Sequence, residues 1–260
     1  MDHATRARAA EDLAVAERDR RPVPPLTETY GAFGVEDAYA VQQLNIEARR
    51  AAGGRVVGHK VGLTAKAMQE MLGVFEPDFG VLLDDMALDD AASVSAQRFL
   101  QPRVEPEVAF VLAAPLKGPG VTVGDVRAAT RFVVPALELI DSRIENWRIT
   151  LSDTIADNAS SAAFVLGRTR TELGELDLTA LDVELYKNGE LVAKGSTSAV
   201  LGDPAQAVAW LANKLGELGA VLGAGEVVMP GSCTSAVAVA AGDRIVARFG
   251  SLGEVAVAFE

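Results

Sequence analysis

The chain has 260 residues, of which 49% are hydrophobic and 23% are charged, and its formal net charge at pH 7 is −12. A chain of this length and apolar content buries a substantial core, which excludes intrinsic disorder. The acidic balance, with a pI near 4.7, excludes nucleic acid as a partner, because phosphate binding requires a basic surface.

Two helices are predicted in the first fifty residues, one from Ala4 to Arg18 and one that follows Gly34. The proline-rich stretch 21–28 between them breaks helical structure. We therefore expect a helical N-terminal subdomain over residues 1–54 and a catalytic domain over residues 55–260.

Beyond this region, short apolar runs separated by Gly, Asp and Pro predict β-strands. The candidates are Val56–Val61, Val104–Leu112, Phe132–Ile140, Phe164–Leu166, Val183–Lys187, Val227–Met229, Ala236–Val239, Ile245–Phe249 and Glu254–Phe259. The last three lie close together, at the spacing of an antiparallel meander. The pattern predicts an α+β fold with mixed, mostly antiparallel β-structure curled around a site.

One late helix has clear boundaries in the sequence. Asp203 is a suitable N-cap, Pro204 suits the first turn, and Gly219 suits the position after the C-cap. Its apolar stripe is formed by Val208, Leu211, Leu215 and Leu218. We expect this helix to be structural.

Several familiar catalytic motifs are missing from the sequence. The two histidines, His3 and His59, are too few for a histidine-rich zinc site, and no serine lies in a G-x-S-x-G motif. The glycines around residues 53–60 lack a lysine in P-loop register. Cys233, the single cysteine, is interpreted as a small buried apolar residue and not as a nucleophile.

Three glutamates carry the strongest chemical signal. Glu105 and Glu107 share one face of a strand, because strand side chains alternate with period two. Glu138 interrupts an otherwise apolar strand, where an unpaired carboxylate is costly. An all-oxygen set suits Mg²⁺ or Mn²⁺. The alternative is a solvated face for the first two and an ion pair of Glu138 with Arg103 or Arg143.

Three other polar groups are weaker candidates. Lys60 lies in a glycine-flanked apolar strand, where it either serves a site or reaches solvent from the surface. The segment 76–80, with Asp78, is expected to form a turn. The segment 157–161 is either a loop or a set of hydrogen-bond donors for a carboxylate.

The sequence resembles the 2-hydroxypenta-2,4-dienoate (2-keto-4-pentenoate) hydratase and 4-oxalocrotonate decarboxylase family of the fumarylacetoacetate-hydrolase-like superfamily. The motifs that carry the resemblance are GHKVGLT (58–64), EPDFG (76–80), RVEPEVAF (103–110), ALELIDSRI (136–144), TIADNASS (154–161) and MPGSCT (229–234). They occur in the same order as in the family, and the resemblance covers essentially the whole chain.

The resemblance implies a role for each matching residue. It assigns Glu105, Glu107 and Glu138 as metal ligands, Lys60 and Asp78 as catalytic groups, and Asp157, Asn158, Ser160 and Thr234 to the substrate pocket. It implies a hydratase that adds water to a 2-hydroxy-2,4-dienoate in a meta-cleavage pathway for aromatic or steroid rings, and a homo-oligomeric assembly.

Two alternatives stay open within this chemistry, and one outside it. A decarboxylase of 4-oxalocrotonate-type 2-oxo-dioates would use the same metal to stabilise an enolate. Hydrolysis of a C–C bond would need His59 as a base, and we expect His59 to face away from Lys60. The third alternative is a non-catalytic, oligomeric interaction protein.

The expected location is the reducing cytoplasm, since one cysteine cannot form an internal disulfide. Residues 1–20 carry charges throughout and resemble no signal peptide. The uncharged stretch 227–242 is too short and polar to span a bilayer. We expect a soluble protein with a small-molecule substrate and no membrane partner.

Overall fold

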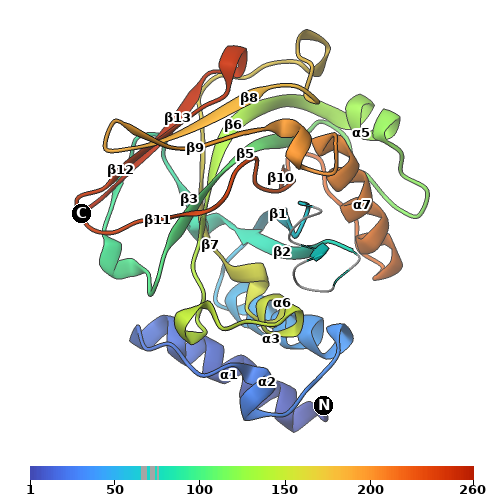
Figure 1. The fold of residues 1–260 in the computed structure, drawn as a ribbon. Helices are drawn as coiled ribbons and strands as arrows, with labels where there is room; N and C mark the ends of the chain where they lie inside the picture. The colour runs from blue at the N-terminus through green and yellow to red at the C-terminus, as the bar shows by residue number, and fades with distance from the viewer. Residues whose placement is uncertain (66–68, 71–73, 75) are drawn as a thin grey trace.

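The computed structural model describes residues 1–65, 69–70, 74 and 76–260, and Figure 1 shows how their elements are arranged. The helices are α1 (His3–Asp19), α2 (Leu26–Thr29), α3 (Val35–Ala51), α5 (Val123–Ala129), α6 (Leu151–Ala156) and α7 (Pro204–Glu217). The longer strands are β1 (Val56–Gly62), β2 (Asp78–Leu83), β5 (Arg103–Leu112), β6 (Thr130–Ile140), β7 (Ser161–Leu166), β8 (Asp182–Lys187), β9 (Glu190–Ser196), β12 (Arg244–Arg248) and β13 (Glu254–Phe259). The short strands are β3 (Ala87–Leu88), β4 (Ser93–Val94), β10 (Val227–Met229) and β11 (Val237–Ala238).

Two sheets form the body of the molecule. The larger has the order β2-β1-β10-β5-β6-β7-β3, with β11 also paired to β5, and the smaller has the order β4-β13-β12-β8-β9. Most pairs are antiparallel, while β1–β10, β3–β7 and β4–β13 are parallel. The prediction of a mixed, mostly antiparallel and curled β-structure with helices at the N-terminus is confirmed.

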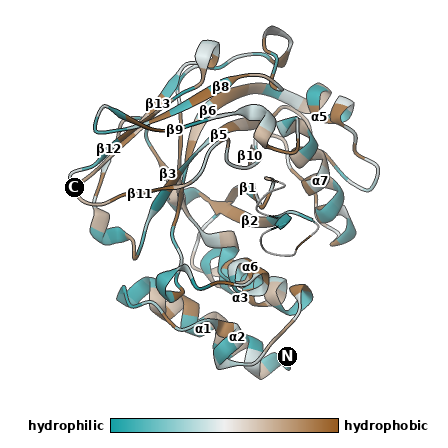
Figure 2. Cartoon of the chain, viewed as in Figure 1, coloured by the Kyte–Doolittle hydropathy of each residue, from teal (hydrophilic) through white to brown (hydrophobic). Residues whose placement is uncertain are grey.

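The alternation of side chains along β5 separates two kinds of environment. Val104, Val108 and Phe110 are fully buried in the large core that also takes in residues of β8, β12 and β13. The opposite face carries Glu105 and Glu107 and continues into a second, smaller core. Figure 2 shows hydrophobic colours along strands such as β2 and β8, and mixed colours on α1 and α2. The glutamates therefore lie at one end of an apolar sheet face.

The helical region lies below the larger sheet in Figure 1. Helices α1, α3 and α6 share an apolar core that includes Leu13, Val41 and Ile155. The proline-rich connector, predicted to lack helix, contains the single turn of α2, which is tied to α6 by hydrogen bonds from Thr27 to Asp153. In the described part of the chain, no helix is long and apolar enough to cross a membrane.

Helix α7 has the predicted N-cap, since the Asp203 side chain accepts a hydrogen bond from Ala205 N, and Pro204 is its first residue. Gly219 follows its end with φ of +76°. Leu218 was predicted to belong to the buried stripe, but it is 58% exposed. The helix ends at Glu217, so Leu218 no longer follows the helical period that would turn it inward.

The structure differs from the sequence predictions at three further segments. The turn predicted at 76–80 is wrong from Asp78 onward, because β2 begins there and pairs with β1. Strand β9, which is mostly exposed and has little apolar alternation, was not predicted. Strand β11 does not continue a meander into β12, because it pairs with β5 in the other sheet. Local pattern gives no information about such long-range pairing.

Candidate metal centre and its surroundings

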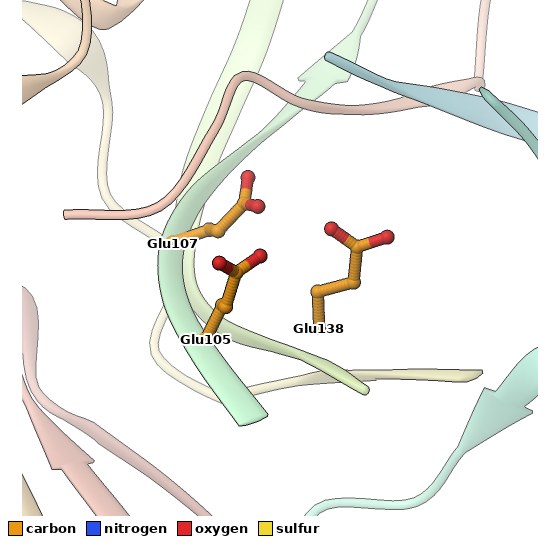
Figure 3. A group of neighbouring side chains, drawn as sticks. All are labelled: Glu105, Glu107 and Glu138. Carbon is orange, nitrogen blue, oxygen red and sulfur yellow. The ribbon is translucent and has the colours of Figure 1, made fainter. Parts of the chain in front are cut away.

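The three predicted glutamates come together at the β5–β6 pair. Glu105 is directly opposite Glu138 in the antiparallel register, and Glu107 lies two residues further along the same face of β5. A carboxylate oxygen from each lies within 4.8 Å of the others. Figure 3 shows the three carboxylates directed toward a shared space, Glu105 and Glu107 from one strand and Glu138 from the opposite side. One ion of the size of Mg²⁺ could therefore contact all three.

Burial makes this cluster costly without a cation. Glu107 and Glu138 are both 0% exposed, and Glu105 is partly exposed. One oxygen of Glu107 accepts a hydrogen bond from Gly231 N at 2.7 Å. Its other oxygen and both oxygens of Glu138 have no hydrogen-bond partner among the residues that the structure describes. Buried oxygens without donors are the expected feature of a site that binds a cation.

The electrostatics of the metal-free cluster favour protonation. Burial raises the pKa of Glu105 to about 7, against the opposing effect of Lys60. Burial and the neighbouring Glu138 and Glu105 raise the pKa of Glu107 well above its usual value. Like charges brought together in a buried space disfavour the ionised form. A divalent cation would reverse this preference, because it binds the ionised carboxylates.

The alternative partners for Glu138 are engaged elsewhere. The guanidinium of Arg143 donates to Asp157, and Arg143 N donates to the same carboxylate at 2.9 Å. The guanidinium of Arg103 lies 4.5 Å from the centre of the Trp147 ring. The structure therefore gives Glu138 no arginine partner within the described ranges, and the all-oxygen set fits a hard divalent ion.

Lys60 lies beside the cluster. It is 4% exposed, so it is no surface lysine. Its Nζ lies 3.4 Å from Glu138 Oε2 and donates a hydrogen bond to Ala159 O at 3.0 Å. Burial alone would lower the pKa of Lys60, but the carboxylates around it, Glu138 first, raise the value above that of a free lysine. Lys60 is therefore held as a cation in the absence of metal.

Asp78 occupies the same region of β1 and β2. It is 2% exposed, and its Oδ1 has no hydrogen-bond partner in the described part of the chain. A Cβ atom at Gly62 would lie 2.1 Å from Asp78 Oδ1 and 3.4 Å from Lys60 Nζ. Glycine at position 62 therefore leaves the space in which both groups sit. Burial raises the pKa of Asp78, and Lys60 opposes that shift.

The polar side chains of the 157–160 segment contact other residues of the protein. Asp157 is held by Arg143 and by Ser142 Oγ. The Asn158 amide bonds both backbone groups of Val81, accepting from N at 2.8 Å and donating to O at 2.9 Å. Ser160 Oγ lies 3.3 Å from Thr154 Oγ1. These contacts are internal to the fold, and only Ala159 O from this segment contacts Lys60.

The 229–234 segment reaches the cluster through its backbone. Thr234 is partly buried, and its Oγ1 donates to Ser235 O. Gly231, which the sequence interpretation did not single out, has φ of +122° and contacts Glu107. A Cβ at Gly231 would lie 2.0 Å from Thr64 Oγ1. The Pro-Gly dipeptide was the available signal, because glycine permits such close approach.

His59 and Cys233 lie outside the cluster. His59 Nδ1 is 3.5 Å from Glu226 Oε2, and the alternation along β1 places it on the face opposite to Lys60. Cys233 is 2% exposed, as expected for a small apolar residue, and burial raises the pKa of its thiol. Tyr39 of α3 is a further neighbour of Asp78, and its Oη accepts a hydrogen bond from Phe79 N at 3.3 Å.

The chain is similar to known proteins over nearly its full length. The chain is 46% identical to the 2-hydroxyhexa-2,4-dienoate hydratase of Comamonas testosteroni, over 95% of this chain and 94% of that protein. It is 44% identical to 2-keto-4-pentenoate hydratase 1 of Dechloromonas aromatica, over 96% of this chain and 95% of that protein.

A solved structure of the 4-oxalocrotonate decarboxylase from Pseudomonas putida G7, complexed with magnesium and adipate, superposes with a TM-score of 0.96. It is 39% identical to this chain, and the superposition covers 100% of this chain and 99% of that one. The model of the fumarylacetoacetate (FAA) hydrolase C-terminal family matches residues 50–259. With the three carboxylates gathered on one sheet face, the chain belongs to the fumarylacetoacetate hydrolase C-terminal family.

Proposed function

We propose that this protein is a divalent-metal-dependent hydratase that converts a 2-hydroxy-2,4-dienoate into a 4-hydroxy-2-oxo acid in a meta-cleavage pathway. The observation that carries the proposal is the cluster of Glu105, Glu107 and Glu138, in which one oxygen of Glu107 and both oxygens of Glu138 are buried without a donor among the described residues. The hydratase relatives, similar over the whole chain, support the reaction class. We propose Mg²⁺ or Mn²⁺ as the ion.

A divalent ion held by the three carboxylates would stabilise negative charge on the 2-oxygen of the substrate. The reaction protonates two carbon atoms: C5 gains a proton as the 2-hydroxyl loses one, and water then adds with its hydroxyl at C4 and a proton at C3. Lys60 and Asp78 are the groups that we propose to move these protons. Both are buried beside the cluster, and an ammonium next to a carboxylate of raised pKa provides an acid and a base.

The remaining pocket assignments rest on the family resemblance. We propose that Ser160 and Thr234 lie near the bound substrate, with Asp157 and Asn158 supporting the 157–160 segment from behind. The contacts of Asp157 with Arg143 and of Asn158 with Val81 favour a supporting role for these two. Carboxylate recognition would then depend chiefly on the metal and on Lys60.

The test is turnover of 2-hydroxypenta-2,4-dienoate with added Mg²⁺ or Mn²⁺. Loss of the conjugated dienol is followed by ultraviolet absorbance, and the 4-hydroxy-2-oxo acid is identified by mass spectrometry. We expect Glu105→Gln to abolish metal-dependent turnover. Full activity of the parent protein in excess chelator would contradict the metal role.

Decarboxylation of a 4-oxalocrotonate-type dioate is the second candidate. It is favoured by the TM-score of 0.96 to a decarboxylase structure. The same ion would stabilise the enolate left after CO₂ loss. Release of CO₂ from 4-oxalocrotonate, measured beside the dienoate assay, separates the two reactions.

We further propose a cytoplasmic homo-oligomer with residues 1–54 as a helical subdomain and residues 55–260 as the catalytic domain. The metal cluster, Lys60 and Asp78 all lie after residue 55. The single, buried Cys233 suits a reducing compartment. Light scattering across a concentration series measures the subunit number.

A further inference from the structure

The segment that contacts Lys60 has an unusual backbone. Asn158, Ala159 and Ser160 have φ values of 54°, 49° and 57°. These are three consecutive left-handed residues, none of which is glycine, and each is unfavourable for an L-amino acid. Such a conformation persists only where surrounding contacts enforce it, and it occurs most often at functional sites.

The Asn158 side chain is one of the contacts that hold this turn from outside, together with Asp141 N, which donates to Ser160 O at 2.8 Å. Strand β2 is at the edge of its sheet, so the outward backbone groups of Val81 face no other strand among the described residues. The amide of Asn158 takes that place, accepting from Val81 N at 2.8 Å and donating to Val81 O at 2.9 Å. Both hydrogen-bonding groups of the amide are thus used within the fold.

The 158–160 turn also contacts the Lys60 side chain. Ala159 O, in the middle of the turn, accepts from Lys60 Nζ at 3.0 Å, and the same Nζ lies 3.4 Å from Glu138 Oε2. An ammonium has three protons, and the hydrogen bond to Ala159 O uses one of them, so protons remain for a bound substrate. Gly80 completes the fit, since a Cβ there would lie 2.5 Å from Asn158 O and 3.2 Å from Lys60 Cγ.

We propose that Asn158 is a positioning residue: its amide clamps the left-handed 158–160 turn to Val81, and the turn presents Ala159 O to fix the ammonium of Lys60 at the metal cluster. Asn158 then acts on the reaction through Lys60 and without contact to substrate. The kinetic part of this proposal rests on the proposed hydratase function, whereas the structural part does not.

The chain offers a matched control. Asn213 of α7 makes the same pair of bonds to one backbone residue, accepting from Val121 N at 2.8 Å and donating to Val121 O at 2.9 Å. Both asparagines are partly buried. Asn158→Gly removes the clamp without adding strain, because glycine tolerates positive φ, and Asn213→Ala removes the equivalent clamp in a helix. Each variant therefore loses one equivalent pair of side-chain hydrogen bonds to a backbone residue.

The first measurement is the Nζ–H signal of Lys60 in protein labelled with ¹⁵N-lysine, assigned by its loss in Lys60→Met. We expect this signal to shift or vanish in Asn158→Gly and to stay in place in Asn213→Ala. This arm needs no substrate, so it remains decisive if the parent protein shows no hydratase turnover. An unchanged Lys60 signal in Asn158→Gly overturns the proposal.

The second measurement is steady-state kinetics with saturating Mg²⁺. We expect kcat of Asn158→Gly to fall about 100-fold, the scale of a small misplacement of a reacting group, with the calorimetric Kd for Mg²⁺ little changed. Asn213→Ala should keep the parent kcat. A shifted Lys60 signal with parental kcat, or equal losses of kcat in both variants, would refute positioning by Asn158.

Discussion

At the scale of single residues, charge balance explains the site. Four carboxyl groups, those of Glu105, Glu107, Glu138 and Asp78, surround the ammonium of Lys60. Buried like charges raise the free energy of the folded state unless a cation compensates them. Four ionised carboxylates outnumber one ammonium by three charges, so a divalent ion would offset most of the excess negative charge. Removing one of these charges should therefore stabilise the metal-free protein and weaken the binding of a divalent ion.

The substitution Glu107→Gln tests both expectations. The amide keeps an acceptor for Gly231 N but removes one buried charge, so the metal-free protein should gain on the order of 1 kcal/mol in unfolding free energy. Affinity for Mg²⁺ should fall by at least about 100-fold, because a ligand is lost. Urea unfolding in chelator and calorimetric titration measure the two effects, with the exposed Glu190→Gln as control. Unchanged Mg²⁺ affinity would rule out Glu107 as a ligand.

The pKa of Glu105, raised by burial to about 7, predicts a pH dependence. In the unfolded chain this carboxyl has the ordinary value of 4.5, so its protonated form stabilises the fold below that pH. That contribution is lost as the pH rises through about 7. The melting temperature of the metal-free protein should therefore fall between pH 5 and pH 7.5, and the fall should be smaller in Glu105→Gln. Mg²⁺ affinity should rise over the same range, since the ion competes with protons.

At the scale of elements, the site depends on close contact between β2 and the 158–160 turn. The contact is possible because Gly80 and Gly62 carry no side chains where the turn, Lys60 and Asp78 approach. The register of β5 with β6 then places Glu105 opposite Glu138. Small shifts of either element would move charged groups that have few other partners.

Gly80→Ala tests the contact between β2 and the turn. The added methyl group would lie 2.5 Å from Asn158 O, so the turn must move. We expect a loss of about 1–3 kcal/mol in unfolding free energy, typical of overpacking, together with a fall in kcat. Gly174→Ala is the control, because nothing lies within 4 Å of the new Cβ. Parental stability and kcat in Gly80→Ala would contradict the tight packing seen here.

At the scale of the whole molecule, the N-terminal helices support the site from behind. Gln42 of α3 donates to Phe79 O in β2 and to Ile155 O in α6, both at 3.0 Å. A cavity of about 650 Å³ lies between α1, α3 and the 156–161 segment. Helix α6 leads directly into the 158–160 turn, so the helical region and the sheet meet where Lys60 is held.

Because the folded chain gathers the ligands and the unfolded chain does not, a divalent ion should stabilise the whole protein. At a Mg²⁺ concentration of 100 Kd, linkage gives about 2.7 kcal/mol, which corresponds to a rise in melting temperature of roughly 5–10 °C for a chain of this size. Differential scanning calorimetry with and without chelator measures it. Glu107→Gln should show little of this rise, and an equal rise in that variant would locate the stabilising ion elsewhere.

Much of the architecture and the main chemical signal could be predicted from sequence. Period-two alternation placed Glu105 and Glu107 on one face, and the isolated charge of Glu138 marked it as a partner in a site. Caps at Asp203 and Gly219 predicted the start and end of α7. Each of these features depends on neighbours a few residues away, and local stereochemistry is sufficient to infer them.

What sequence alone determined is therefore the family, the mostly antiparallel class and the residues able to bind a metal. Only the tertiary structure decided that Asp78 begins a strand, that Arg143 pairs with Asp157 and not with Glu138, and that Asn158 bonds Val81. Strand register and side-chain partners depend on residues far apart in the chain. Their free energies arise from packing and desolvation in the folded molecule, which no local pattern encodes.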